Sequence, residues 1–308
     1  MVVIDTIHSC FVHGIVDSIF SAYWIKYDIM KNMPELGKNF GVFVRKGDVE
    51  KYPEQNLKNI DPETSRFKGV YDELMNLVTT KKIVFEHLMD ENDVFLIKDC
   101  FFTKLDTQNQ RSLWNRGEDY PGRNLGEKVF DDDHIQRMLN LYIQDILNIY
   151  GLEKNPESFK KNIVIVDRKT EYRSLAKTWL HDKEGENVSE MPSLLDKLDI
   201  FLSTQPLLNY NGIVYLEDLS MKEQMECFLN NDIIITPHGA NMVHGLWSNK
   251  KIIIEVLYDE KKAGMYKRIM SFTNNKLAQI SPYQIYDFIK LLVMRFKNTS
   301  GPTVTEVN

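Results

Sequence analysis

The sequence contains only three cysteines among its 308 residues, and they lie far apart, at Cys10, Cys100 and Cys227. Neither a zinc-binding pattern nor a disulfide framework is therefore indicated. Long apolar runs are absent as well, and a membrane-spanning helix would need roughly 18–20 such residues. The first residues, MVVIDTIHSCFVHG, lack the basic start that is typical of a signal peptide. We expect a soluble protein of the cytoplasm, with no signal peptide and no membrane span.

An excess of positive charge is also missing, because 38 lysines and arginines face 44 aspartates and glutamates and leave a net charge of −6. This balance argues against a protein that binds nucleic acid through a general basic field. The sequence has neither a G-x-x-x-x-G-K phosphate loop nor an H-E-x-x-H metal pattern. The run 131–133 resembles an Asp-x-Asp metal clamp, but its place at the start of an expected helix favours a cap that complements the dipole. We expect no metal site.

What the sequence does contain is an alternation of short apolar runs and amphipathic segments on both sides of a linker that begins at Gly151. The expected strands are 2–4, 40–45, 82–85, 94–97, 163–166, 213–216, 233–235 and 252–257. The expected helices are 14–32, 70–79, 131–150, 171–180, 221–229, 241–248 and 283–296. This order predicts two α/β domains with parallel sheets, 1–153 and 154–280, followed by a helix and tail at 281–308. Ligands of such domains bind in a cleft at the carboxyl ends of the strands.

Two clusters of the second half fall at such strand ends. The stretch PHGAN, residues 237–241, follows the isoleucine run 233–235. A strand, a small-residue turn and a helix start would offer backbone N–H groups to an anion, although a plain turn explains the pattern equally well. The stretch VDRKTEYR supplies Arg168, Lys169 and Arg173, cations suited to phosphate oxygens. Taken alone, this second cluster is better explained as a solvated helix start.

Two further clusters have simple alternatives. Ser220 and Glu223 form the pattern of a capping box, which satisfies free N–H groups at a helix start and by itself explains that segment. His13 and Asp17 are four residues apart, so on a helix they would share one face. A carboxylate beside an imidazole suits acid–base chemistry, and a surface pair is an equal alternative.

Taken together and in order, the C-terminal clusters resemble glycosyltransferase family 61. The resemblance rests on IVIVDRKTEYR, then on LEDLSMKEQMECFLNNDIIITPHGANMVHGLWSNKKIIIEVL, and more weakly on CFVHGIVDSIFSAYW near the start. The matching positions in the second half include Ser220, Glu223, Gln224, Asp232, Pro237, His238, Gly239, Ala240 and Glu255. Asn241 departs from the pattern, since it stands where a second glycine is common, and His244 replaces an expected small polar residue.

The resemblance implies a GT-B-like fold, in which two facing Rossmann-like domains with parallel sheets enclose a cleft. The first domain would bind the acceptor and the second the nucleotide sugar. Transfer would proceed with inversion from a UDP-sugar to a hydroxyl of a glycan or glycoprotein, without a metal or other cofactor. The donor-binding residues would be Arg168, Lys169, Arg173, Ser220, Glu223, Gln224, His238, Gly239, Ala240, Asn241 and Glu255.

The acceptor hydroxyl needs a general base from the first domain. Asp17 is the first candidate, with His13 as its partner or as a contact to the acceptor; Asp72 is the reserve, although dipole complement at a helix start explains it better. The chain is similar to the compact soluble members that bacteria or large algal viruses encode, and xylose from UDP-xylose is the preferred sugar. The alternatives are UDP-N-acetylglucosamine or another UDP-sugar, a non-catalytic nucleotide-sugar or glycan-binding protein, and a His-x-x-x-Asp acyltransferase.

Overall fold

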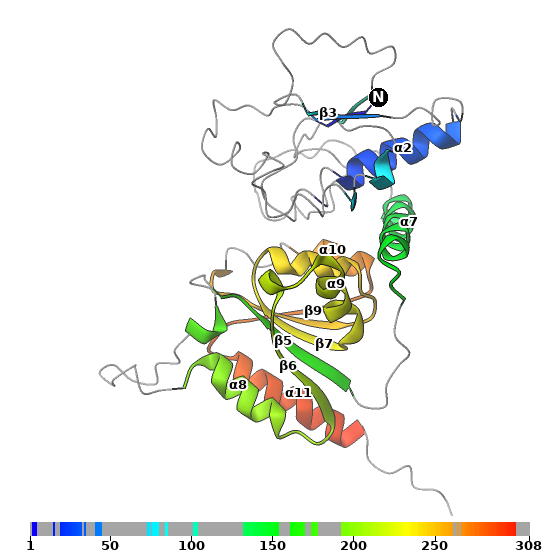
Figure 1. The fold of residues 1–308 in the computed structure, drawn as a ribbon. Helices are drawn as coiled ribbons and strands as arrows, with labels where there is room; N and C mark the ends of the chain where they lie inside the picture. Colours follow the sequence, from blue (N-terminus) through cyan, green and yellow to red (C-terminus); the bar gives the residue numbers. More distant parts are fainter. Residues whose placement is uncertain are drawn as a thin grey trace, which may run out of the picture. The chain divides into compact units, whose positions relative to one another are not determined.

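The computed structural model divides into two compact units, Met1–Gly151 and Leu152–Asn308, which are described separately (Figure 1). The described residues of the first unit are 2–4, 15, 19–32, 34, 41–44, 73–74, 76–79, 84–85, 101–103 and 132–151. Those of the second unit are 152–153, 161–169, 174–177, 192–260, 264 and 266–299.

The second unit is built on a five-stranded sheet in the order β6-β5-β7-β8-β9. Its strands are β5 (Lys161–Asp167), β6 (Leu208–Tyr215), β7 (Ile233–Pro237), β8 (Ile252–Val256) and β9 (Lys276–Ile280). Every neighbouring pair is parallel, so all five carboxyl ends lie at one edge. The predicted α/β class with a parallel sheet is confirmed for this unit.

Helices cover both faces of this sheet (Figure 1). The helices α8 (Leu194–Ser203) and α11 (Ile285–Thr299) lie on one face, and α9 (Met221–Asn230) and α10 (Lys267–Phe272) lie on the other. Because both faces are covered, the central strands need no polar face, which explains their continuous isoleucine runs. All five residues of β7 are buried.

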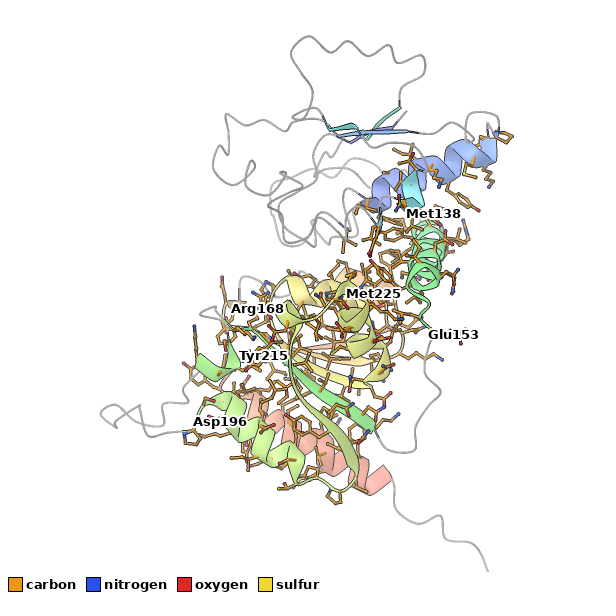
Figure 2. All side chains as sticks on the ribbon, in the orientation of Figure 1. Met138, Glu153, Arg168, Asp196, Tyr215 and Met225 are labelled. Carbon is orange, nitrogen blue, oxygen red and sulfur yellow. The ribbon has the colours of Figure 1, made fainter. Side chains whose placement is uncertain are left out.

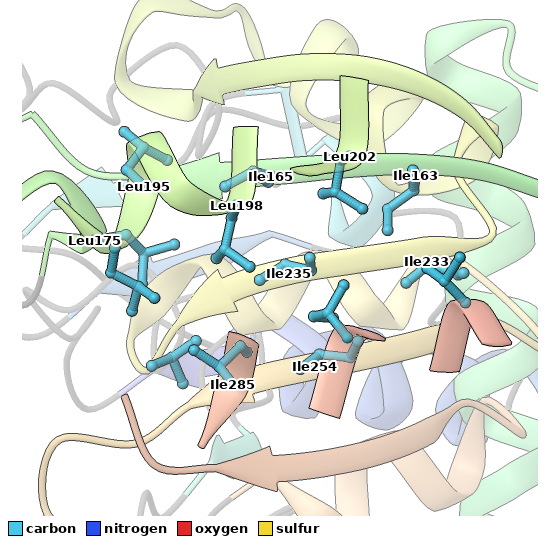
Figure 3. Close-up of a cluster of buried hydrophobic side chains, with 14 of the residues drawn as sticks. Ile163, Ile165, Leu175, Leu195, Leu198, Leu202, Ile233, Ile235, Ile254 and Ile285 are labelled. Atoms are coloured by element: carbon cyan, nitrogen blue, oxygen red, sulfur yellow. The ribbon is translucent and has the colours of Figure 1, made fainter. Parts of the chain in front are cut away.

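A hydrophobic core cluster lies between the sheet and the α8–α11 pair, as Figure 3 shows. Ile163 and Ile165 of β5 point to this face, together with Ile233 and Ile235 of β7. Their sequence neighbours Val164 and Ile234 are also buried but are not part of the cluster, as the two-residue period of a strand requires. Leu198 of α8 packs into the same cluster.

The first unit has a four-stranded parallel sheet in the order β3-β2-β1-β4. Its strands are β1 (Val2–Ile4), β2 (Val42–Val44), β3 (Val84–Phe85) and β4 (Phe101–Thr103). The helices α2 (Phe20–Asn32) and α7 (Asp132–Tyr150) pack together, with the rings of Phe20 and Tyr23 each 5.2 Å from that of Tyr142. The Tyr23 hydroxyl donates to Asp145 at 2.6 Å and closes this contact.

Several expected elements differ from the observed ones. The helix expected at 241–248 is a 3-10 helix, η6 (Ala240–Leu246), and the described part of the segment 171–180 holds only the short 3-10 helix η3 (Leu175–Lys177). The strand expected at 213–216 begins earlier, at Leu208, and Leu216 opens the 3-10 helix η5 (Leu216–Asp218). The elements α8, α10, β4 and β9 were not predicted, and the strand expected at 94–97 lies outside the described residues. None of the helices in the described ranges combines the length and the apolar character needed to cross a bilayer.

Candidate functional site

The candidate site lies at the carboxyl ends of two neighbouring strands. Arg168 follows β5 directly, and His238 and Gly239 follow β7, its partner in the sheet. Figure 2 shows Arg168 at the same end of the sheet as Tyr215, the last residue of β6. Two clusters that are about seventy positions apart in the sequence therefore meet at one sheet edge, where ligands of parallel α/β folds bind.

The Arg168 guanidinium lies directly against the backbone of Gly239. A methyl group placed on Gly239 would stand 1.9 Å from Nη2 and 2.6 Å from Cζ of Arg168. Gly239 also has φ +153° and ψ −163°, a conformation that side-chain-bearing residues rarely adopt. Arg168 is only 8% exposed. The glycine is thus needed to seat a largely buried cation beside the turn.

His238 is held from behind by a buried carboxylate. Its Nδ1 lies 2.6 Å from Oε1 of Glu255, which is 0% exposed at the end of β8. The other carboxylate oxygen, Oε2, accepts a hydrogen bond from Gln279 of β9 at 2.7 Å. The ring of Tyr266 packs beside the imidazole, with 5.5 Å between centroids. Sequence reasoning missed Gln279, because nothing in the local pattern of β9 indicates its neighbours.

Asn241 adds a buried donor to the same turn. Its Nδ2 is buried, and no partner for it exists among the residues that the structure describes. A buried amide donor costs free energy unless it is hydrogen-bonded, so this atom is well suited to an oxygen of a bound ligand. The helix η6 starts beside it with Gly239 at the N-cap, and therefore without a capping side chain.

Asp167 organises the segment that follows β5. Its carboxylate is 0% exposed and accepts hydrogen bonds from the Ser174 hydroxyl at 2.9 Å, from the Leu175 amide at 2.8 Å and from the Ala176 amide at 3.3 Å. These bonds tie the start of η3 to the end of β5, next to Arg168. Sequence reasoning did not single out Asp167, although an acidic residue directly after a buried strand must find hydrogen-bond donors.

Lys169 is engaged at the exposed rim of the edge. Its Nζ lies 2.6 Å and 2.5 Å from the two carboxylate oxygens of Asp218, and both side chains are about half exposed. The same ammonium group lies 5.7 Å from the centre of the Tyr215 ring. An exposed pair of this kind stabilises the fold little. The charge of Lys169 is therefore already partly balanced by Asp218, and a phosphate at this rim would have to share the ammonium group with that carboxylate.

The predicted capping box at Ser220 is confirmed. The Ser220 hydroxyl accepts from the Glu223 amide at 3.4 Å, and the Glu223 carboxylate accepts from the Ser220 amide at 2.8 Å and hydroxyl at 2.7 Å. These bonds hold the pKa of the Glu223 carboxyl below its usual range. Gln224 donates to the carbonyls of Leu216 and Leu219, at 3.0 Å and 2.9 Å. The observed bonds of these three side chains fix the start of α9.

His244 is part of the core under the turn. Its Nδ1 accepts a hydrogen bond from the Trp247 indole at 3.2 Å, and its ring lies 5.5 Å from that of Phe228. Burial lowers the pKa of His244 from 6.5 to about 3, because the charged form would lose its hydration. The imidazole is therefore neutral and carries its proton on Nε2.

This buried histidine should make the protein less stable in mild acid. The pKa of His244 is about 6.5 when unfolded and about 3 when folded, so the unfolded chain binds the extra proton between these values. Stability then rises with pH across this window, and is lost as pH falls below 6.5. We expect a loss of roughly 2 kcal/mol at pH 5 relative to neutral pH.

Urea unfolding of wild type and of His244→Gln at pH 5 and pH 7.5 would measure this effect. The variant is expected to be less stable at pH 7.5, where it disturbs a packed core, and to lose less stability on acidification. Equal losses in the two proteins would contradict the assignment of a neutral buried imidazole.

Four predicted site residues, His13, Asp17, Asp72 and Arg173, lie outside the described residues. Within the described ranges, no three histidine, cysteine, aspartate or glutamate side chains gather as a metal site would require. The structure thus brings together Arg168, His238, Gly239, Asn241 and Glu255. Ala240 begins η6 in the same turn.

Comparison with known families gives a match that covers most of the chain. A family model described as Glycosyltransferase 61 matches residues 11–254. This range makes up most of the chain and contains Arg168 and the turn 237–241, and it ends one residue before Glu255. The sequence matches no curated protein.

Proposed function

The chain belongs to glycosyltransferase family 61, and from this premise we propose that it moves a sugar from a UDP-sugar to a hydroxyl of a glycan or glycoprotein acceptor, with inversion. Xylose from UDP-xylose is the preferred donor in this proposal, and UDP-N-acetylglucosamine or another UDP-sugar is the alternative. The two units would face each other as GT-B domains, with the acceptor on the first and the donor on the second.

The observation that carries the proposal is the contact between Arg168 and Gly239 at the carboxyl edge of the parallel sheet. A guanidinium presents several fixed N–H donors in a plane, and phosphate oxygens accept such donors in pairs. The buried Nδ2 of Asn241 supplies one more donor in the same turn. A cation, a glycine turn and an unused amide together suit a diphosphate.

The chemistry of the transfer explains why a cation is needed there. The bond between the anomeric carbon and the diphosphate oxygen breaks, and its electron pair stays on the diphosphate. The acceptor oxygen bonds to the opposite face of the anomeric carbon, and a base removes its proton. Arg168 would stabilise the charge that grows on the leaving diphosphate without help from a metal ion. Asp17, paired with His13, is the proposed base, and Asp72 is the reserve.

A thermal-shift screen tests the donor. Purified protein would be heated with UDP-xylose, UDP-N-acetylglucosamine, UDP-glucose or UDP-galactose in the presence of EDTA. A ligand at a hundred times its dissociation constant stabilises the folded state by about 2.7 kcal/mol, which raises the melting temperature by a few degrees. We expect a clear rise with one UDP-sugar, lost in Arg168→Ala and retained in the control Arg295→Ala, which removes an exposed cation from α11.

Activity would then be followed by incubating the selected donor with glycan acceptors and determining the anomeric configuration of the product by NMR. An inverted linkage is expected. If no UDP-sugar shifts the melting temperature, with EDTA or with added manganese, the donor proposal is wrong.

A further inference from the structure

A continuous line of hydrogen bonds runs behind His238 and ends on a backbone amide. The amide of Gly264 donates to Oε1 of Gln279 at 3.0 Å, Nε2 of Gln279 donates to Oε2 of Glu255 at 2.7 Å, and Oε1 of Glu255 lies 2.6 Å from Nδ1 of His238. It links His238 after β7, Glu255 of β8 and Gln279 of β9. It ends at Gly264, which lies shortly before α10 in the sequence.

The backbone amide fixes the direction of every bond in the line. An amide N–H can only donate, so the oxygen of the Gln279 side chain must face Gly264. Its NH₂ group must then face Glu255 and donate to the carboxylate. Gly264 has φ +83°, a conformation favoured by glycine, so the orientation of its N–H depends on the residue type at this position.

The consequence reaches His238. With one carboxylate oxygen of Glu255 taken by Gln279, the other accepts a hydrogen bond from the imidazole, so Nδ1 carries a proton. The second ring nitrogen, Nε2, is directed away from Glu255, and it can donate to a phosphate oxygen when it too carries a proton. Both carboxylate oxygens of Glu255 are hydrogen-bonded and its side chain is fully buried. Glu255 therefore influences a bound ligand through His238.

The Gln279 amide is the component that keeps this carboxylate in place. A buried carboxylate is costly unless its oxygens are hydrogen-bonded, and a single bond to His238 would leave Glu255 able to rotate. A hydrogen bond made by one ring nitrogen of a histidine generally sets the orientation and the tautomer of the ring. Gln279 satisfies the second oxygen from the neighbouring strand.

We propose that Gln279 is a positioning residue of the nucleotide-sugar site, which acts through Glu255 to present Nε2 of His238 to the diphosphate of the donor. This inference rests on the proposed function, because that function defines the ligand. It adds a residue of β9, outside the sequence clusters, to the determinants of donor binding.

The test measures binding of UDP by calorimetry to wild type, Gln279→Met and Gln279→Glu. Methionine has a similar length but makes neither amide bond, so we expect UDP to bind roughly tenfold more weakly, the scale of a lost charge-assisted hydrogen bond. The control Gln284→Met makes the same chemical change at an exposed position near the start of α11, and should bind UDP as wild type does. Thermal unfolding of each protein shows that it is folded.

The Gln279→Glu variant separates positioning from simple packing. Its carboxylate can still accept from Gly264 but cannot donate to Glu255, and the two negative groups repel each other. Protonation restores a donor, so we expect its UDP affinity to approach that of wild type as pH falls from 8 to 5.5. Among the residues that the structure describes, its titratable neighbours in this line are Glu255 on β8 and His238 after β7, with Tyr266 against the His238 ring. Dividing the UDP affinity of the variant by that of wild type at the same pH removes the contribution that these groups make in both proteins.

The UDP affinity of Gln279→Met relative to that of wild type is expected to stay constant from pH 8 to pH 5.5. If wild type binds UDP and Gln279→Met binds it equally well, or if the Gln279→Glu ratio does not change with pH, this inference alone is overturned. If wild type itself does not bind UDP, the proposed function fails together with the role of Gln279 in it.

Discussion

Replacing Gly239 with alanine is expected to lower transfer activity by at least about a hundredfold, the scale on which the loss of one charge-stabilising group acts. The added methyl group would stand 1.9 Å from Nη2 of Arg168, so the guanidinium must leave its place. The backbone conformation at φ +153° adds strain. Rates with the donor that the thermal-shift screen selects would measure the effect, alongside a circular dichroism spectrum of the folded variant.

Gly212→Ala is the matched control for this prediction. Gly212 also has a positive φ, +80°, but no atom lies within 4 Å of a methyl group placed there. It should cost about 1–2 kcal/mol of stability and leave the activity of the folded protein unchanged.

If Gly239→Ala acts by displacing Arg168, its effect and that of Arg168→Ala will not add in the double variant. Additive losses would show that the two residues act independently, contrary to the contact in the structure.

Replacing Asp167 with alanine is expected to reduce the free energy of unfolding by about 3 kcal/mol. The change leaves the Leu175 and Ala176 amides and the Ser174 hydroxyl without their carboxylate, and Ser174 and Leu175 are buried from water. Such a loss would lower the melting temperature by roughly 6–12 °C if the second unit unfolds as a domain of 150–250 residues. Urea unfolding followed by fluorescence would give the free energy.

Ser174→Ala removes only one of the three donors and should cost about 1 kcal/mol. Equal stability of Asp167→Ala and wild type would contradict the role of this carboxylate. Because Asp167 precedes Arg168, we also expect Asp167→Ala to weaken UDP binding in the molecules that remain folded.

The local features that the sequence determined are those in which a short segment carries its own signal. The isoleucine run 233–235 predicts a buried strand, because only a strand covered on both faces can be apolar at every position. Ser220 and Glu223 predict their capping box, because the partners are three residues apart. The ordered motifs of the second half likewise identified the family.

Elements with weaker local signals were missed. Strand β9 is only partly buried and reads KLAQI, which has no uninterrupted apolar run. Helix α8 carried a usable signal, since Ser193 and Asp196 form a capping box ahead of Leu198 and Leu202. The segment Ala240–Leu246 has a helical composition, yet it forms a 3-10 helix, and the choice between these helices depends on what packs around it.

Only the tertiary structure decided which side chains meet. The packing of Arg168 on Gly239 follows from the parallel register of β5 and β7, and the line from His238 to Glu255 and Gln279 crosses three adjacent strands. Local sequence patterns report neighbours three or four positions away on a helix and two on a strand. Contacts between strands depend on sheet order and register, which arise from burying all the helices and strands together, and so the partners of the site residues appear only in the folded chain.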